Sequence, residues 1–144
     1  MKHLKAFEKF LPLPDIDNDI PTIITKKKLL EIHDDLIEKY GGIYGIRSDS
    51  QLESCLSRPY MSAFGEDIYP DEFSKVSAFL EAIINNHPLA DGNKRTGFQC
   101  MVWILKQQGF TFKLSYDESR PFLVRISSHY LDVSEISEWI QQNI

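Results

Sequence analysis

The chain has 144 residues, of which 42% are apolar, and a formal net charge of −5 at pH 7. This length suits one domain with its own hydrophobic core. The negative charge argues against broad binding to nucleic acids or anionic membranes, because both attract basic surfaces. Cys55 and Cys100 provide no disulfide framework, and their apolar helical surroundings favour buried, reduced thiols. Met1 opens onto charged, mixed sequence, so we expect no signal peptide, no membrane span and a cytoplasmic protein.

The N-terminal part of the chain predicts a lead-in followed by a helix. Prolines and an acidic run interrupt residues 1–24, for which we predict a partly extended segment packed on a domain of residues 25–144. A helix should begin near Thr25, a residue type that caps helices, and should end at the glycine pair 41–42. His33 lies on or beside the apolar face of this helix, where a structural histidine is expected.

A second helix and an irregular segment follow. The helix is predicted over roughly 49–58, with Ser50 and Glu53 at the spacing of a capping box. Residues 59–70 mix aromatic side chains with turn residues and have no helical period, so we interpret them as a flap or an irregular hairpin. Loops of this length between helices are often functional.

Two strongly apolar helices flank a short polar turn. The third helix should begin near residues 70–72 and finish close to His87, because Pro88 disfavours helical geometry at the residue before it. The fourth helix should start at or just after Asn93 and is apolar almost all round, which places it in the middle of the core.

The C-terminal part predicts three further elements and no separate domain. Residues 110–114 suggest a short extended piece, and helices are expected around 118–127 and about 133–143. No internal repeat or linker is present, so the pattern predicts one mainly α domain. Arg47 and Arg58 are most simply interpreted as salt-bridging surface residues.

The polar turn has the composition of an anion site. Residues 87–96 read His-Pro-Leu-Ala-Asp-Gly-Asn-Lys-Arg-Thr, a density of polar groups that is costly to order unless they bind something. A helix that starts at Asn93 offers free backbone N–H groups and a positive dipole end, and Gly92 permits close approach of a ligand. Lys94 and Arg95 add positive charge, so the expected ligand is a di- or triphosphate.

The same turn supplies a candidate metal ligand and a candidate base. Asp91 is its only carboxylate, and Mg²⁺ is often held by one or two carboxylates together with substrate phosphates. A neutral His87 could accept a proton from an incoming hydroxyl group, as phosphoryl transfer requires. Each residue alone has an ordinary structural interpretation as a cap or a turn residue. The complete set, between two apolar helices, favours a function.

Other nucleotide and metal signatures are missing from the sequence. It contains neither a P-loop, nor a G-x-G-x-x-G fingerprint, nor the signature set of protein kinases. Its histidines and cysteines also lack the spacing of a zinc site.

Residues 87–96 resemble the H-x-F-x-D-[GA]-N-K-R-T signature of the Doc (death-on-curing) branch of the Fic/Doc proteins, and the resemblance extends over roughly residues 25–110. It implies a compact, all-α, single-domain helical bundle with a flap before the catalytic loop, a place that residues 59–70 would take. It implies that His87 is the general base and that Asp91 holds Mg²⁺. The residues that would clamp the phosphates of ATP are Asn93, Lys94 and Arg95, with the amides near Gly92.

Departures from the Fic pattern indicate which part of ATP is transferred. Most Fic members transfer AMP and carry glycine where this chain has Lys94, and a second arginine where it has Phe98. Both differences match the Doc branch, which implies transfer of the γ-phosphate of ATP to a threonine of elongation factor Tu and arrest of translation. Leu89 replaces the usual phenylalanine and packs the loop with less volume.

The resemblance also bears on control and leaves two alternatives open. No inhibitory [ST]-x-x-x-E-[GN] helix is found, so control would fall to a separate antitoxin protein. No direct contact with nucleic acid or membrane is expected. The alternatives to a Doc-type toxin kinase are transfer of AMP to a protein hydroxyl and an inactive Doc-fold module that only binds a partner.

Overall fold

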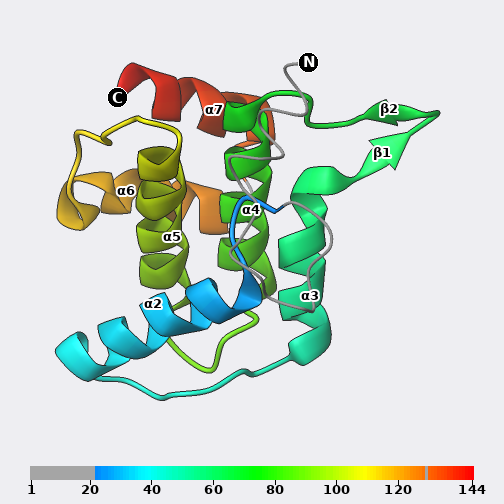
Figure 1. Cartoon of the computed structure of the whole chain (residues 1–144). Coiled ribbons are helices and arrows are strands. Elements are labelled where there is room, and N and C mark those ends of the chain that lie inside the picture. The colour runs from blue at the N-terminus through cyan, green and yellow to red at the C-terminus, as the bar shows by residue number, and fades with distance from the viewer. Residues whose placement is uncertain (1–21, 129) are drawn as a thin grey trace.

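The computed structural model describes residues 22–128 and 130–144, so the predicted lead-in over residues 1–24 lies almost entirely outside the described residues. The described part is a bundle of helices with one small hairpin (Figure 1). Its elements are α2 (Lys26–Tyr40), α3 (Asp49–Ser57), η1 (Arg58–Tyr60), β1 (Ser62–Ala63), β2 (Glu66–Asp67), α4 (Glu72–Asn86), α5 (Asn93–Gln107), α6 (Tyr116–Ser127) and α7 (Val133–Gln142). The all-α fold class is therefore confirmed.

Side-chain caps explain where several helices begin. Thr25 caps α2 as predicted, since its hydroxyl accepts a hydrogen bond from the Lys28 amide at 3.0 Å. The predicted cap of α3 is wrong by two residues: Ser48 accepts from the Gln51 amide at 3.2 Å, and Ser50 lies inside the first turn. Residues 110–114 are neither helix nor strand, so the short extended piece expected there pairs with no other strand of the described residues.

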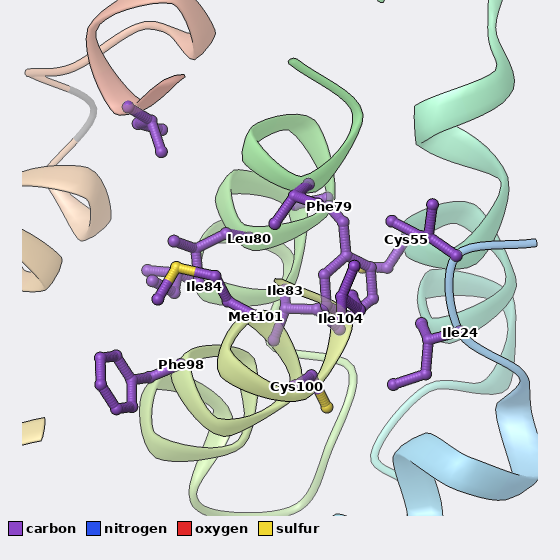
Figure 2. Close-up of a cluster of buried hydrophobic side chains, with 14 of the residues drawn as sticks. Ile24, Cys55, Phe79, Leu80, Ile83, Ile84, Phe98, Cys100, Met101 and Ile104 are labelled. Carbon is purple, nitrogen blue, oxygen red and sulfur yellow. The ribbon is translucent and has the colours of Figure 1, made fainter. Parts of the chain in front are cut away.

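Helix α4 is the centre of the bundle. It packs against α3, α5, α6 and α7, and eight of its residues are buried. Figure 2 shows its apolar side chains meeting those of α5. The two helices approach closely at Gly97, where a β-carbon would lie 3.1 Å from the Ile83 side chain. The prediction that the fourth helix lies in the core is confirmed for α5, which shares the centre with α4.

Both cysteines are reduced and fully buried, as predicted. Burial raises the pKa of the Cys55 thiol to about 11, because removal from water disfavours the thiolate. Burial also raises the pKa of Cys100 far above its ordinary value. Neither thiol is suited to nucleophilic chemistry at neutral pH.

The hairpin expected within residues 59–70 is present, but it does not lie beside the polar turn. Strands β1 and β2 pair antiparallel and lead into the N-terminal end of α4. The turn of residues 87–92 follows the opposite end of this helix, which at 15 residues is roughly 22 Å long. Figure 1 shows the hairpin projecting from that far end. Its base is fixed by an ion pair of 2.7 Å between Arg58 and Glu81, which confirms the salt-bridging interpretation of Arg58.

Among the helices of the described residues, none combines the length and the apolar character that crossing a membrane requires.

Truncating the α4–α5 contact should destabilise the domain. Ile83→Ala leaves a cavity against α5, and we expect it to lower the free energy of unfolding by about 2–5 kcal/mol. Urea denaturation followed by circular dichroism measures this loss. Val124→Ala, on an exposed part of α6, is the control and should stay within about 0.5 kcal/mol of the parent. A loss at Ile83 no larger than the control's would contradict the packing described.

The thiols should be protected only by the fold. In the native protein, Ellman's reagent at neutral pH should label neither Cys55 nor Cys100, because both are buried. After unfolding in urea, the reagent should label both. Rapid labelling of either native thiol would show that its surroundings open readily.

Candidate active site

The turn between α4 and α5 is bounded by two residues in left-handed conformation. His87 ends α4 with φ 48°, and Gly92 begins α5 with φ 69°. Glycine adopts this geometry without steric cost, whereas histidine does so at a cost of about 1–3 kcal/mol that the surroundings must offset. The geometry of His87 therefore depends on contacts that hold the turn in place.

Those contacts come from residues 41–48, the loop between α2 and α3. Ile46 forms a β-bridge with Leu89, and the Gly45 carbonyl accepts a hydrogen bond from the Ala90 amide at 3.0 Å. The amides of Arg47 and Ser48 both donate to the Pro88 carbonyl, at 2.8 and 3.1 Å. The loop 41–48, rather than the hairpin, thus lies beside the turn.

Arg47 binds the end of α4. Its guanidinium group donates from Nε to the His87 carbonyl and from Nη2 to the Asn86 carbonyl, the latter at 2.7 Å. These carbonyls at the end of the helix have no partner within it, and they lie at the negative end of its dipole, where a cation is stabilising. Arg47 is exposed as predicted, but its interpretation as a salt-bridging residue is wrong, because its partners are the backbone carbonyls of Asn86 and His87.

The Asp91 carboxylate is oriented by two backbone amides. Oδ2 accepts a hydrogen bond from the Ile43 amide at 3.2 Å, and Oδ1 accepts one from the Gly92 amide at 2.9 Å. Gly42 permits this approach, since a β-carbon there would lie 2.7 Å from Asp91 Oδ2. These bonds fix the carboxylate and leave lone pairs for a further ligand.

His33 supports Asp91 from the interior. Its ring is fully buried, which confirms a structural histidine, and its Nε2 lies 2.8 Å from the Asp91 carbonyl. Because a carbonyl oxygen can only accept, Nε2 carries the proton and donates. A buried residue of α2 therefore positions the turn.

Asn93 closes the turn on itself. Its side-chain oxygen accepts from the Leu89 amide at 2.8 Å, and its side-chain nitrogen donates to the Leu89 carbonyl at 3.0 Å. The sequence predicted a phosphate ligand here. The observed bonds instead use the Asn93 amide to hold Leu89, which is buried as predicted, and the Asn93 backbone N–H remains for a ligand.

A pocket of about 210 Å³ opens at the start of α5. It lies between this helix and the end of α2, and it is lined by Leu36, Ile37, Tyr40, Gly41, Asp91, Gly92, Arg95 and Thr96. No side chain of the described residues caps the helix, so its first amides have no side-chain partner. The buried Thr96 hydroxyl also lacks a hydrogen-bond partner within the described part of the chain. These features suit an anion.

The predicted site residues are only partly brought together by this pocket. Asp91, Gly92 and Arg95 line it, whereas Lys94 is half-buried on the first turn of α5 outside the lining. His87 is exposed at the other end of the turn, and its ring makes no hydrogen bond within the described residues. The imidazole is therefore free to meet a substrate hydroxyl. A larger hollow of about 580 Å³ lies away from the turn, between the start of α4 and one side of α7.

The carboxylate chemistry of the turn fits Mg²⁺ delivered with a nucleotide. The described residues contain no group of three histidine, cysteine or acidic side chains that could enclose a metal. A single oriented carboxylate is nevertheless enough for Mg²⁺ when phosphates and waters supply its other ligands. Asp91 is the residue that would hold the ion.

Comparison with known proteins agrees with this geometry. The sequence profile of the Fic/DOC family matches residues 23–105. The chain is 32% identical to Toxin Doc of Mycolicibacterium smegmatis over 81 residues, which are 56% of this chain and 62% of that protein. It is 29% identical to Protein kinase doc of Escherichia phage P1 over 86 residues, 60% of this chain and 68% of that one. The match to Toxin Doc thus spans about three fifths of that protein's length.

The backbone support of Asp91 can be tested at Gly42. Gly42→Ala places a methyl group against the Asp91 carboxylate and the Ile37 side chain, so we expect displacement of the carboxylate and weaker binding of MgATP by calorimetry. Gly45→Ala is the matched control, because Gly45 also has positive φ but has open space where a β-carbon would lie. Both variants should lose about 1–3 kcal/mol of stability through backbone strain. Equal MgATP affinity in the two variants would contradict the proposed contact.

Proposed function

Since this chain belongs to the Fic/DOC family, we propose that it is a Doc-type toxin that transfers the γ-phosphate of ATP to a hydroxyl group of a protein. The observation that carries the proposal is the pocket at the start of α5, where the Asp91 carboxylate and the Arg95 guanidinium group line one cavity. Free helix amides, a cation and a metal-binding carboxylate are the groups that a triphosphate needs. The names of the two relatives support the toxin and kinase assignments.

His87 would act as the general base of the transfer. Its exposed imidazole would accept the proton as the substrate O–H bond breaks and a new bond forms between that oxygen and the γ-phosphorus. The bond between the γ-phosphorus and the bridging oxygen breaks, and ADP leaves with the bond's electron pair. Mg²⁺, held by Asp91, would supply charge neutralisation when bound.

Arg95 and the first amides of α5 would stabilise the charge of the phosphates. A guanidinium group can donate two parallel hydrogen bonds to phosphate oxygens. Lys94, Gly92 and the Asn93 backbone N–H would complete the clamp, while the Asn93 side chain keeps the turn closed. ATP and Mg²⁺ are the required small molecules.

The environment of Phe98 supports transfer of phosphate over transfer of AMP. AMP-transferring Fic proteins place a second arginine at this position, three residues after Arg95. Here the phenylalanine ring is 4% exposed and packs edge-on against Phe112 and Tyr116. This position therefore offers no cation to a terminal phosphate.

The target and the regulator belong to the same proposal. We propose a threonine of elongation factor Tu as the acceptor, which would arrest translation and requires a cytoplasmic protein. A separate antitoxin protein would control the activity, as the toxin name of the Mycolicibacterium smegmatis relative suggests.

ATP labelled at one phosphate distinguishes the reactions. Incubated with purified elongation factor Tu, the protein should transfer label from the γ-phosphate and none from the α-phosphate, measured by radioactivity in the protein band. His87→Ala should reduce the rate by about 10²–10⁴-fold, since it removes the general base. Gln99→Ala, exposed on α5, is the control and should retain the parent rate.

Each alternative has its own result in this experiment. Label retained from the α-phosphate would establish AMP transfer instead. If neither label were transferred and His87→Ala remained as toxic in cells as the parent, the protein would be a binding module.

A further inference from the structure

Two tyrosines enclose the guanidinium group of Arg95. Its Cζ lies 4.2 Å from the ring centroid of Tyr40 and 4.2 Å from that of Tyr116. Each ring therefore lies within cation–π distance of the guanidinium group. Tyr40 ends α2 and Tyr116 begins α6, and the cation is therefore enclosed by two helices besides its own.

The cation has no carboxylate partner among the described residues. Arg95 forms no ion pair there, so its N–H groups remain available to a ligand. Arginine stacks well on aromatic faces because it is planar and weakly hydrated. Contact with both rings restricts the motion of the guanidinium group beside the pocket that Arg95 lines.

Tyr116 is itself fixed by the core. Its ring packs edge-on against Phe98, with centroids 5.6 Å apart and an angle of 71°. Phe98 contacts Phe112 in the same way, Phe112 contacts Trp139, and Trp139 stacks on Phe122 at 4.0 Å. Tyr116 thus connects Arg95 to an aromatic cluster shared by α5, α6 and α7, and it lies outside residues 23–105 that match the family.

We propose that Tyr40 and Tyr116 are positioning residues that hold Arg95 with its N–H edge toward the phosphates of the nucleotide. This inference rests on the proposed function. A free arginine side chain loses rotamer freedom when it grips a ligand, and the rings remove that freedom before the ligand arrives. Their flat faces supply the restraint, whereas their hydroxyl groups are not needed for it.

Polyphosphate binding tests the inference directly. Calorimetry would measure the dissociation constants of ATP and of inorganic tripolyphosphate, each with Mg²⁺. The variants are Tyr116→Leu and Tyr116→Phe, and likewise Tyr40→Leu and Tyr40→Phe. The leucine variants should bind both ligands about 3- to 10-fold more weakly, the range expected for loss of one cation–π contact. The phenylalanine variants keep the ring and should restore binding to within about twofold of the parent.

A control separates positioning from loss of stability. Tyr60 is also partly buried against the core, its hydroxyl accepts a hydrogen bond from the Ile23 amide, and it is not among the residues that line the pocket. Tyr60→Leu should lower Tm as Tyr116→Leu does, yet leave both dissociation constants unchanged. Equal weakening by Tyr60→Leu would overturn the inference, as would leucine variants that bind like the parent or phenylalanine variants that fail to restore binding.

Failure of the proposed function would be detected in the label-transfer experiment, not in these binding measurements. A parent protein that transfers no label from ATP refutes the kinase, whereas the inference is judged by the difference between leucine and phenylalanine variants. If Arg95→Ala left the affinity of the protein for tripolyphosphate unchanged, Arg95 would not bind phosphate, and the inference would be overturned.

Discussion

The backbone pairing between residues 41–48 and the turn 87–92 is the interaction on which the candidate site depends. The turn begins with a left-handed histidine and carries a carboxylate, two features that a free loop would not keep in a fixed geometry. Hydrogen bonds to the carbonyls of Pro88 and His87 and to the Asp91 carboxylate fix it from one side. His33 fixes the Asp91 carbonyl from the other. The chemistry of the turn is therefore set by residues about forty to sixty positions earlier in the chain.

A second constraint comes from the C-terminal helices. Phe98 lies one turn after Arg95 on α5, and its burial against Phe112 and Tyr116 orients the aromatic cluster toward the start of that helix. The same packing that stabilises α5, α6 and α7 thus determines the surroundings of the cation. Helices α6 and α7, which follow the motif in the chain, are thus linked to Arg95 through aromatic contacts.

The sequence predicts elements better than it predicts the partners of polar side chains. Local signals such as the Thr25 cap and Pro88 after α4 locate helix ends, because their effects act within one turn. The motif likewise locates the turn and its charged groups. The roles of Arg47 and Tyr116 could not be predicted, because each depends on a segment distant in the sequence. Arg47 at least falls within residues 25–110, over which the resemblance extends, whereas Tyr116 lies outside them.

The density of polar groups in the turn has two causes rather than one. Part of it satisfies the turn itself: the Asn93 amide bonds twice to Leu89, and the carbonyls of His87 and Asp91 bind Arg47 and His33. The remainder has no such internal use within the described residues, namely the His87 ring, the Thr96 hydroxyl and the edge of the Arg95 guanidinium group. A turn that only needed to connect two helices would require the first set alone. The Thr96 hydroxyl and the Arg95 guanidinium group lie beside a helix N-terminus without a side-chain cap, and a bound polyphosphate would satisfy them, whereas the exposed His87 ring at the other end of the turn remains for a substrate hydroxyl.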